Sequence, residues 1–197
     1  MAEKRCGWCL SSPLYQQYHD EEWGRPATDD ATLFEFLLLE GAQAGLAWIT
    51  VLNKREHYRK VFDGFDPQKI ARYSPKKIEK LLQDPGIIRN RLKVESAVRN
   101  ARATLALWDA GQTLGEFLWQ FTDGRVLVNK RRSLKQVPAT TAESDAMSKA
   151  LKKAGFNFVG STIMYAHMQA TGMVNDHLVT CPAHRECLDE AAAKKLL

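Results

Sequence analysis

Residues 33–52 read LFEFLLLEGAQAGLAWITVL. Apolar side chains recur here every three or four positions, which is the spacing of one face of an α-helix. That face is formed by Leu33, Leu37, Glu40 and Ala44, so a carboxylate lies in the middle of it. A buried carboxylate is costly unless a partner meets it or its pKa rises. We therefore expect Glu40 to meet either a cation of the same chain or a polar or cationic ligand.

The residues after Glu40 predict a break and an exposed turn. Gly41 and Gly45 lower the helix propensity, and Leu46 and Trp48 follow them directly. A leucine and a tryptophan on an exposed turn beside a polar pocket indicate a wedge. The simpler alternative is a core helix in which Glu40 is paired with one of the many Arg or Lys residues.

The composition is typical of a globular protein. The chain has 197 residues, of which 45% are hydrophobic, and 28 Lys and Arg against 23 Asp and Glu give a net charge of +5. This length suffices for a core without disulfides, and the charge only weakly favours phosphate-bearing partners. No apolar run reaches the ~18 residues of a membrane span, and no signal peptide is visible. We expect a cytoplasmic protein without a membrane partner, in which four cysteines are thiols or metal ligands.

The periodicity predicts an all-α fold in a single unit spanning residues 1–197, with a helical core over about 28–173 and terminal segments over about 1–27 and 174–187. Only residues 125–128 have the alternation of a strand, within a connector at 125–142 that holds the basic run 130–132. Residues 188–197 are expected to fray. Beyond the helix of Glu40, helices are predicted over about 49–63, 68–73, 76–83, 91–108, 117–121, 145–154 and 161–171.

Cys6 and His19 lie near one end of the chain, and His177 and Cys181 near the other. Two cysteines and two histidines satisfy a closed tetrahedral zinc site, and the spacing of four in the second pair places both side chains on one face of a helical turn. Such a site would join the two terminal segments. Two alternatives stay open: Cys6 and Cys9 as a redox or metal-binding pair, or simple packing of these side chains.

A second pattern indicates a helical hairpin. Gly155 ends one predicted helix, capped by Ser144, and Gly160 precedes a second, for which Ser161 is the expected cap. The first backbone amides of the second helix would then be free to bind a phosphate. Most helical hairpins bind nothing, and residues 81–93, around Pro85 and Gly86, compete for the same role.

The chain resembles the 3-methyladenine DNA glycosylase I (Tag) family from Arg5 to about Cys181. The resemblance is carried by dispersed, specific motifs: Cys6-Gly-Trp8, Tyr15-x-x-Tyr18-His19-Asp20, Glu22-Trp23-Gly24, residues 39–52, Gly86-Ile-Ile-Arg89, residues 144–153, Gly155-Phe-x-Phe-Val-Gly160 and Val174-Asn-Asp-His177. It implies a helix-hairpin-helix DNA glycosylase with one structural zinc per chain. The implied ligands are Cys6, His19, His177 and Cys181, whereas Cys9 and Cys187 fall outside the pattern.

The resemblance also implies roles for the remaining motifs. The implied activity is monofunctional: it flips 3-methyladenine out of alkylated double-stranded DNA, hydrolyses its glycosidic bond and leaves an abasic site. Glu40 is then the catalytic polar anchor for a base made cationic by N3-methylation, with Asp176 structural. The implied pocket walls are Trp8, Tyr18, Trp23 and Trp48, and the implied DNA-binding residues are the plug and wedge Gly45 and Leu46 with the hairpin residues Gly155, Gly160, Ser161 and Thr162.

The expected partners are alkylated DNA and free 3-methyladenine as product, and the expected state is a monomer. The alternative from another class is a zinc-stabilised helical module that binds DNA without cutting it. Such a module has no reason to place Glu40 among aromatic side chains. A weaker alternative is a thiol redox protein that uses Cys6 and Cys9.

Overall fold

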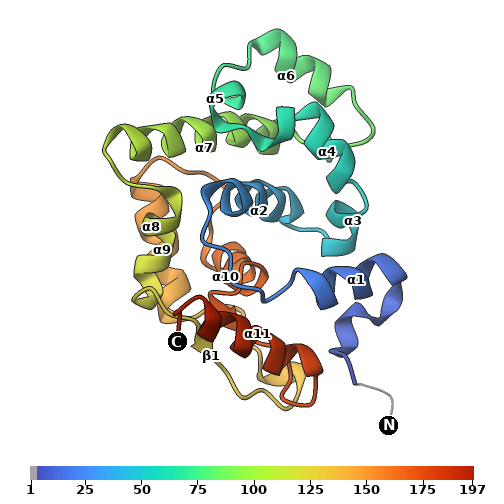
Figure 1. Cartoon of the computed structure of the whole chain (residues 1–197). Coiled ribbons are helices and arrows are strands. Elements are labelled where there is room, and N and C mark those ends of the chain that lie inside the picture. The colour runs from blue at the N-terminus through green and yellow to red at the C-terminus, as the bar shows by residue number, and fades with distance from the viewer. Residues whose placement is uncertain (1–3) are drawn as a thin grey trace.

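The computed structural model describes residues 4–197 and is almost entirely helical (Figure 1). Helix α2 (Asp30–Gln43) lies at the centre, with α10 (Ser161–Ala170) packed beside it. The other helices are α1 (Pro13–Glu21), α3 (Trp48–Leu52), α4 (Arg55–Val61), α5 (Pro67–Ile70), α6 (Pro75–Leu82), α7 (Arg91–Asp109), α8 (Leu114–Trp119), α9 (Ala142–Lys153) and α11 (Pro182–Ala193). The all-α expectation is confirmed in its main feature.

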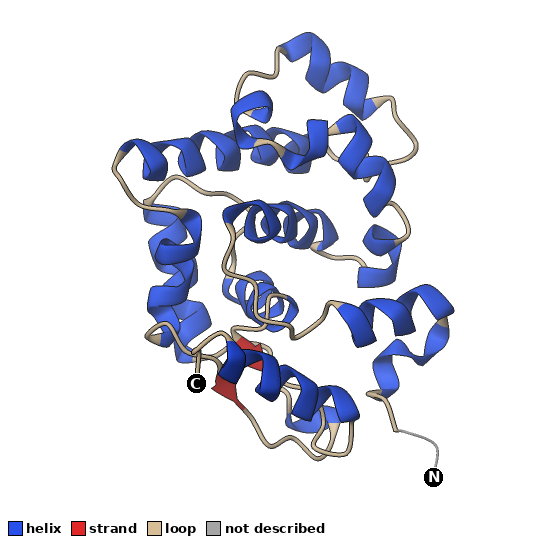
Figure 2. Ribbon diagram, viewed as in Figure 1, coloured by secondary structure: helices blue, strands red, loops and turns tan. Residues whose placement is uncertain are grey.

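Two short parallel strands are the exception (Figure 2). Strand β1 (Leu127–Val128) pairs with β2 (Val174–Asn175) and so joins the connector to the segment that follows α10. The first lies inside the stretch whose alternation suggested a strand, whereas the second was not predicted. A strand of two residues is too short to show a period of two in the sequence.

Helix α2 is central because it is apolar on nearly every side. Leu33, Phe34, Leu37 and Leu39 have no exposed surface, and α3, α7, α8 and α10 all pack against the helix. Asp29 caps its first turn, with its Oδ1 accepting from Thr32 N at 2.8 Å. In a helix that is buried on nearly all sides, each polar residue has a defined position. Glu40 is one of these polar residues.

Several predicted starts of helices are confirmed. Asp66 and Ser74 each accept a hydrogen bond from the first turn that follows them, and a proline occupies the first position of both helices. The hairpin differs from the prediction at its caps. Thr141, not Ser144, caps α9, and Ser161 is the first residue of α10, whose cap is Gly160.

Other predicted boundaries were wrong. Helix α2 continues through Gly41 and ends at Gln43, so only Gly45, with φ +78°, follows a true end. The predicted helix over 49–63 is divided between α3 and α4, which turn at residues 53–54. Residues 188–197 do not simply fray, because α11 continues to Ala193 and Leu196 O accepts from Val126 N at 2.7 Å.

Helix α1 was missed by the sequence reasoning. Its inward face carries Tyr15, Tyr18 and His19, of which Tyr18 and His19 are buried. Aromatic and imidazole side chains give little of the aliphatic periodicity by which a helix is recognised. Within residues 4–197 no helix combines the length and the apolarity needed to cross a bilayer.

Candidate active site and metal centre

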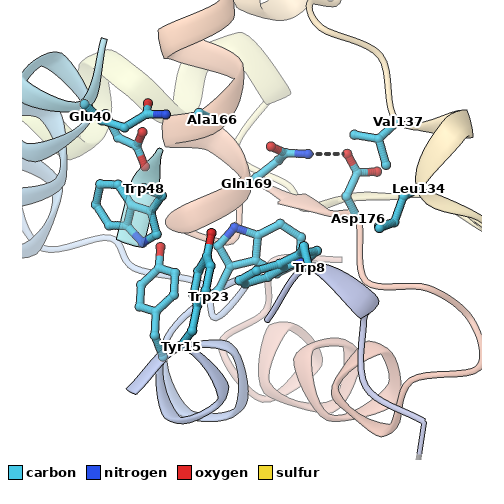
Figure 3. Close-up of a pocket in the computed structure, with 12 residues that line it drawn as sticks. Trp8, Tyr15, Trp23, Glu40, Trp48, Leu134, Val137, Ala166, Gln169 and Asp176 are labelled. Carbon is cyan, nitrogen blue, oxygen red and sulfur yellow. Dashed lines mark hydrogen bonds between the residues drawn. The ribbon is translucent and has the colours of Figure 1, made fainter. Parts of the chain in front are cut away.

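A cavity of about 250 Å³ opens beside the C-terminal half of α2. This volume lies at the small end for ligand sites and suits one compact molecule. The lining residues come from the N-terminal segment, four helices, the connector and the segment after β2: Trp8, Tyr15, Tyr18, Trp23, Glu40, Gln43, Trp48, Leu134, Val137, Ala166, Gln169 and Asp176. Glu40 and Trp48 lie on one side, and Gln169 and Asp176 on the other (Figure 3).

Glu40 is the decisive residue of this cavity. Its side chain is only 4% exposed, yet among residues 4–197 it has neither a hydrogen bond nor an ion pair. Burial raises the pKa of Glu40 to about 8. The alternative of a core carboxylate paired with an Arg or Lys residue is therefore wrong, since no cation within residues 4–197 forms an ion pair with Glu40 and burial is the cause of its raised pKa.

All four predicted aromatic residues line the cavity together. The ring centroid of Trp8 lies 5.0 Å from that of Trp23, and Tyr18 lies 5.5 Å from Trp48. Tyr15, which the sequence reasoning did not assign to the site, packs edge-on against Trp8 at 4.9 Å. These contacts fix the ring orientations and present electron-rich faces and edges to a ligand.

Trp48 adds a polar group to its aromatic surface. Its indole Nε1 is buried and has no acceptor among the described residues. Buried donors are nearly always paired, so an unpaired one in a cavity wall indicates a ligand acceptor. Glu40 and Trp48 together offer an acceptor and a donor that the protein itself leaves unused.

Asp176 lies across the cavity and, unlike Glu40, has hydrogen-bond partners for both of its carboxylate oxygens. Its Oδ1 accepts from Asn129 Nδ2 at 2.7 Å and from Arg131 Nε at 3.1 Å, and its Oδ2 accepts from the Tyr165 hydroxyl and from Gln169 Nε2. A carboxylate with four donors holds its surroundings together. Its partner Gln169 is a polar lining residue that the sequence reasoning missed, and so is Gln43. Gln43 lies one turn after Glu40, which was the available signal.

The predicted wedge lies just outside the cavity. Gly45 and Leu46 follow the end of α2, and 39% of the Leu46 side chain is exposed. Gln43 holds this turn, since its Nε2 donates to Leu46 O at 2.8 Å. An exposed leucine on a restrained turn is suited to insertion into a partner.

The predicted hairpin connects α9 to α10. Gly155, with φ +93°, turns the chain after α9. No side chain caps α10, so the backbone amides near Ser161 and Thr162 are not used by a cap. In the competing segment Gly86 N donates to Asp84 Oδ1 and Ile88 N to the Tyr58 hydroxyl, so these amides are already occupied. The geometry favours the hairpin at 155–162 as the anion-binding element.

The four predicted metal ligands form one buried cluster. All ligand atoms of Cys6, His19, His177 and Cys181 lie within 4.8 Å of one another. Cys181 Sγ lies 3.6 Å from His19 Nε2, and Cys6 Sγ lies 3.7 Å from His177 Nδ1. A tetrahedral zinc with sulfur at ~2.3 Å and nitrogen at ~2.0 Å separates such atoms by about 3.5 Å, so the cluster fits the ion.

The two other cysteines lie outside this cluster. The Cys9 thiol donates to Cys6 O at 3.1 Å, and Cys187 is buried on α11 without belonging to the group. Cys9 is therefore not one of the residues that could hold the metal together with Cys6. Hydrogen bonding, chiefly with Cys6, lowers the pKa of Cys181 and favours the thiolate that binds metal.

Comparison with known proteins identifies the family. A family model described as methyladenine glycosylase matches residues 8–185. The chain is 52% identical over 178 residues to DNA-3-methyladenine glycosylase 1 of Escherichia coli K12, a match that covers 90% of this chain and 95% of that protein.

Two solved structures agree with this assignment. A crystal structure of 3-methyladenine DNA glycosylase I (TAG) has a TM-score of 0.91 and 51% identity, covering 92% of this chain and all of that one. A structure on 3-methyladenine recognition by the Staphylococcus aureus protein has a TM-score of 0.89 and 32% identity, covering 93% and 98% of the two chains. The cavity with its unpaired carboxylate thus belongs to a fold shared by these enzymes, and the chain belongs to the methyladenine glycosylase family.

Proposed function

We propose that this enzyme removes 3-methyladenine from alkylated double-stranded DNA by hydrolysis and leaves an abasic site. The observation that carries the proposal is Glu40, a buried carboxylate without a partner in an aromatic cavity. The relatives named as 3-methyladenine glycosylases support the choice of base.

The electrostatics of the cavity favour a cationic base. Burial raises the pKa of Glu40 to about 8, so the carboxyl group tends to hold its proton at neutral pH. A positive charge nearby stabilises the carboxylate and lowers this pKa. Adenine methylated at N3 carries that charge while it is bound to deoxyribose, whereas adenine does not. Aromatic faces of Trp8, Tyr18 and Trp48 add cation–π attraction.

The reaction needs little chemical assistance because the base is already a good leaving group. The bond between C1′ of the sugar and N9 of the base breaks, and its electron pair neutralises the departing base. Water adds its oxygen to C1′ and releases one proton. Glu40 acts by stabilising charge and orienting the base. Among the described residues that line the cavity there is no lysine, so no side chain there forms a Schiff base, as expected for monofunctional chemistry.

Two elements would bind the DNA around the cavity. Gly45 and Leu46 fill the space left by the extruded nucleotide, and the amides near Ser161 bind a backbone phosphate as in a helix-hairpin-helix protein. The net charge of +5 is consistent with a polyanionic partner. Leu46 would act on the duplex and Glu40 on the base, so the two functions are separable.

We assign the Cys/His cluster to one structural zinc ion per chain. When bound, the ion supplies four coordination bonds that join the N-terminal segment to the segment before α11. His19 Nδ1 lies 2.8 Å from Asp20 Oδ1, and His177 Nε2 lies 2.9 Å from Trp23 O. These contacts leave His19 Nε2 and His177 Nδ1 for the metal.

The proposal is tested by incubating the protein with methylated duplex DNA and identifying the released bases by chromatography. Release of 3-methyladenine from DNA that keeps its strands intact supports it. The matched Glu40→Gln protein should release the base much more slowly. Tight DNA binding without any released base would instead support the non-catalytic DNA-binding module.

A further inference from the structure

Helix α7 contacts both elements that the proposed function assigns to DNA. Lys93 reaches the end of α2, and Asn100 reaches the hairpin between α9 and α10. The two residues are seven positions apart, about two turns, and so lie on one face of the helix. One rigid element therefore holds the wedge and the hairpin.

The Lys93 contact is made to the last turn of α2. Its Nζ donates to Ala42 O at 2.8 Å and to Ala44 O at 2.7 Å. Carbonyls at the end of a helix lack partners within the helix, and a cation placed there also complements the helix dipole. Ala44 directly precedes Gly45, so the ammonium group restrains the chain at the start of the wedge.

The other end of the same turn is restrained from α2 itself. Leu46 N donates to Gln43 O at 2.7 Å, and the Gln43 side chain donates back to Leu46 O at 2.8 Å. Gly45 has no neighbour within 4 Å of the position where a Cβ would be. The space on that side of Gly45 is open, and the hydrogen bonds of Gln43 and Lys93 restrain the turn.

Asn100 makes the corresponding contact to the hairpin. It is buried, and its side chain exchanges two hydrogen bonds with the backbone of Asn157, at 2.7 and 3.0 Å. These two hydrogen bonds fix the backbone of the hairpin to α7. Helix α7 therefore contributes to the distance between Leu46 and the hairpin, beside the direct packing of α2 against α10 and against Phe158 of the hairpin.

We propose that Lys93 is a positioning residue for base extrusion: by holding Ala42 O and Ala44 O it places Leu46 at a fixed distance from the phosphate-binding hairpin. The inference rests on the proposed function. Lys93 does not line the cavity that contains Glu40, so it acts on the duplex step and leaves recognition of the base unchanged.

The test compares Lys93→Met, which keeps the aliphatic stem and removes the ammonium group, with Lys93→Arg, which keeps donors. Lys69→Met on α5 is the control for loss of a lysine charge. Displacing a group by about 1 Å costs up to ~100-fold in rate, so we expect single-turnover excision from methylated duplex DNA to fall at least about tenfold in Lys93→Met. Binding of free 3-methyladenine should stay within about twofold, and Lys93→Arg should recover part of the rate.

A double-mutant cycle identifies the route of the effect. If Lys93 acts through the wedge, Lys93→Met should add little to the defect of Leu46→Ala. The inference would be overturned if the defects of Lys93→Met and Leu46→Ala multiplied in the double variant. Weakened binding of the free base to Lys93→Met, or an unchanged excision rate in it, would overturn it as well. Failure of the unmodified protein to release 3-methyladenine would instead refute the proposed function itself.

Discussion

His177 and Trp23 connect the Cys/His cluster to the cavity wall. His177 Nδ1 faces the two cysteine sulfurs, while its Nε2 lies 2.9 Å from Trp23 O, and the two rings meet edge-on with centroids 4.6 Å apart. A Cβ at Gly24 would lie 2.8 Å from His177 Nε2, so this approach requires glycine. A change in the position of His177 within the Cys/His cluster would therefore also move Trp23, which forms part of the cavity wall.

One tightly bound zinc per chain should be found by elemental analysis of protein purified without added metal. Cys181→Ala should lower the Tm by about 10 °C because it removes a ligand, whereas Cys9→Ala should change the Tm little. Removing the metal should also weaken binding of free 3-methyladenine, since Trp23 loses its support. Equal Tm changes in the two variants, or a stable protein free of metal, would defeat the assignment.

Glu40→Gln keeps the shape of the side chain and removes its charge. A charge-assisted hydrogen bond contributes roughly 1.5 to 3 kcal/mol, so single-turnover excision of 3-methyladenine should slow by about one to two orders of magnitude. Binding of the free base should weaken as well, which calorimetric titration measures. If Glu40→Gln excised and bound 3-methyladenine like the unmodified protein, the carboxylate would take no part in either step.

The pKa of Glu40, about 8, predicts two dependences on pH. Because the carboxylate is the form that favours a cation, kcat/KM should rise with pH up to about 8. The folded state holds a proton that the unfolded state releases near pH 4.5, so the folded protein loses stability as the pH rises from about 4.5 to 8. In thermal melts, Glu40→Gln should lack this loss of stability between about pH 4.5 and 8. If the stability of both proteins depended on pH in the same way, the raised pKa would be contradicted.

Leu46→Ala and Trp48→Ala should separate extrusion from recognition. Loss of the wedge should reduce excision from duplex DNA and leave binding of the free base nearly unchanged. Loss of the Trp48 ring should reduce both, because stacking on a base contributes ~1 to 3 kcal/mol. The measurements are excision rates beside titrations of 3-methyladenine. Parallel losses in the two variants would argue against a separate wedge.

Gly160→Val tests the hairpin without disturbing the fold. Its φ is −63°, and no atom lies within 4 Å of the position of an added Cβ. A bulky side chain beside the amides of α10 should weaken binding to damaged and undamaged duplex equally, because phosphate contacts carry no sequence information. Arg89→Ala serves as the comparison in the competing segment, where a change at Gly86 would clash with His57. Loss of binding only in Arg89→Ala would reassign the DNA contact.

The sequence by itself determined the features that are local. The apolar run around Glu40, the capping residues Asp66 and Ser74, and the spacing of His177 and Cys181 each depend on residues within one or two helical turns. The fold class and the position of Glu40 on a buried helix could therefore be predicted, and the family followed from motifs spread along the chain. Helix α2 was predicted because Leu33, Leu37 and Ala44 recur at the spacing of one helical face.

Only the tertiary structure decided which groups pair. Whether Glu40 had a cation partner depended on how other helices pack around it, and within residues 4–197 none of them brings it a cation. The Cys6 and His177 pair and the contact of Lys93 with Ala44 join residues 171 and 49 positions apart. Such groups meet only when whole helices pack against one another. The local periodicity of the sequence does not encode that packing. For the same reason the lining residue Gln169 was not predicted, because only the packing of α10 against the cavity places it there.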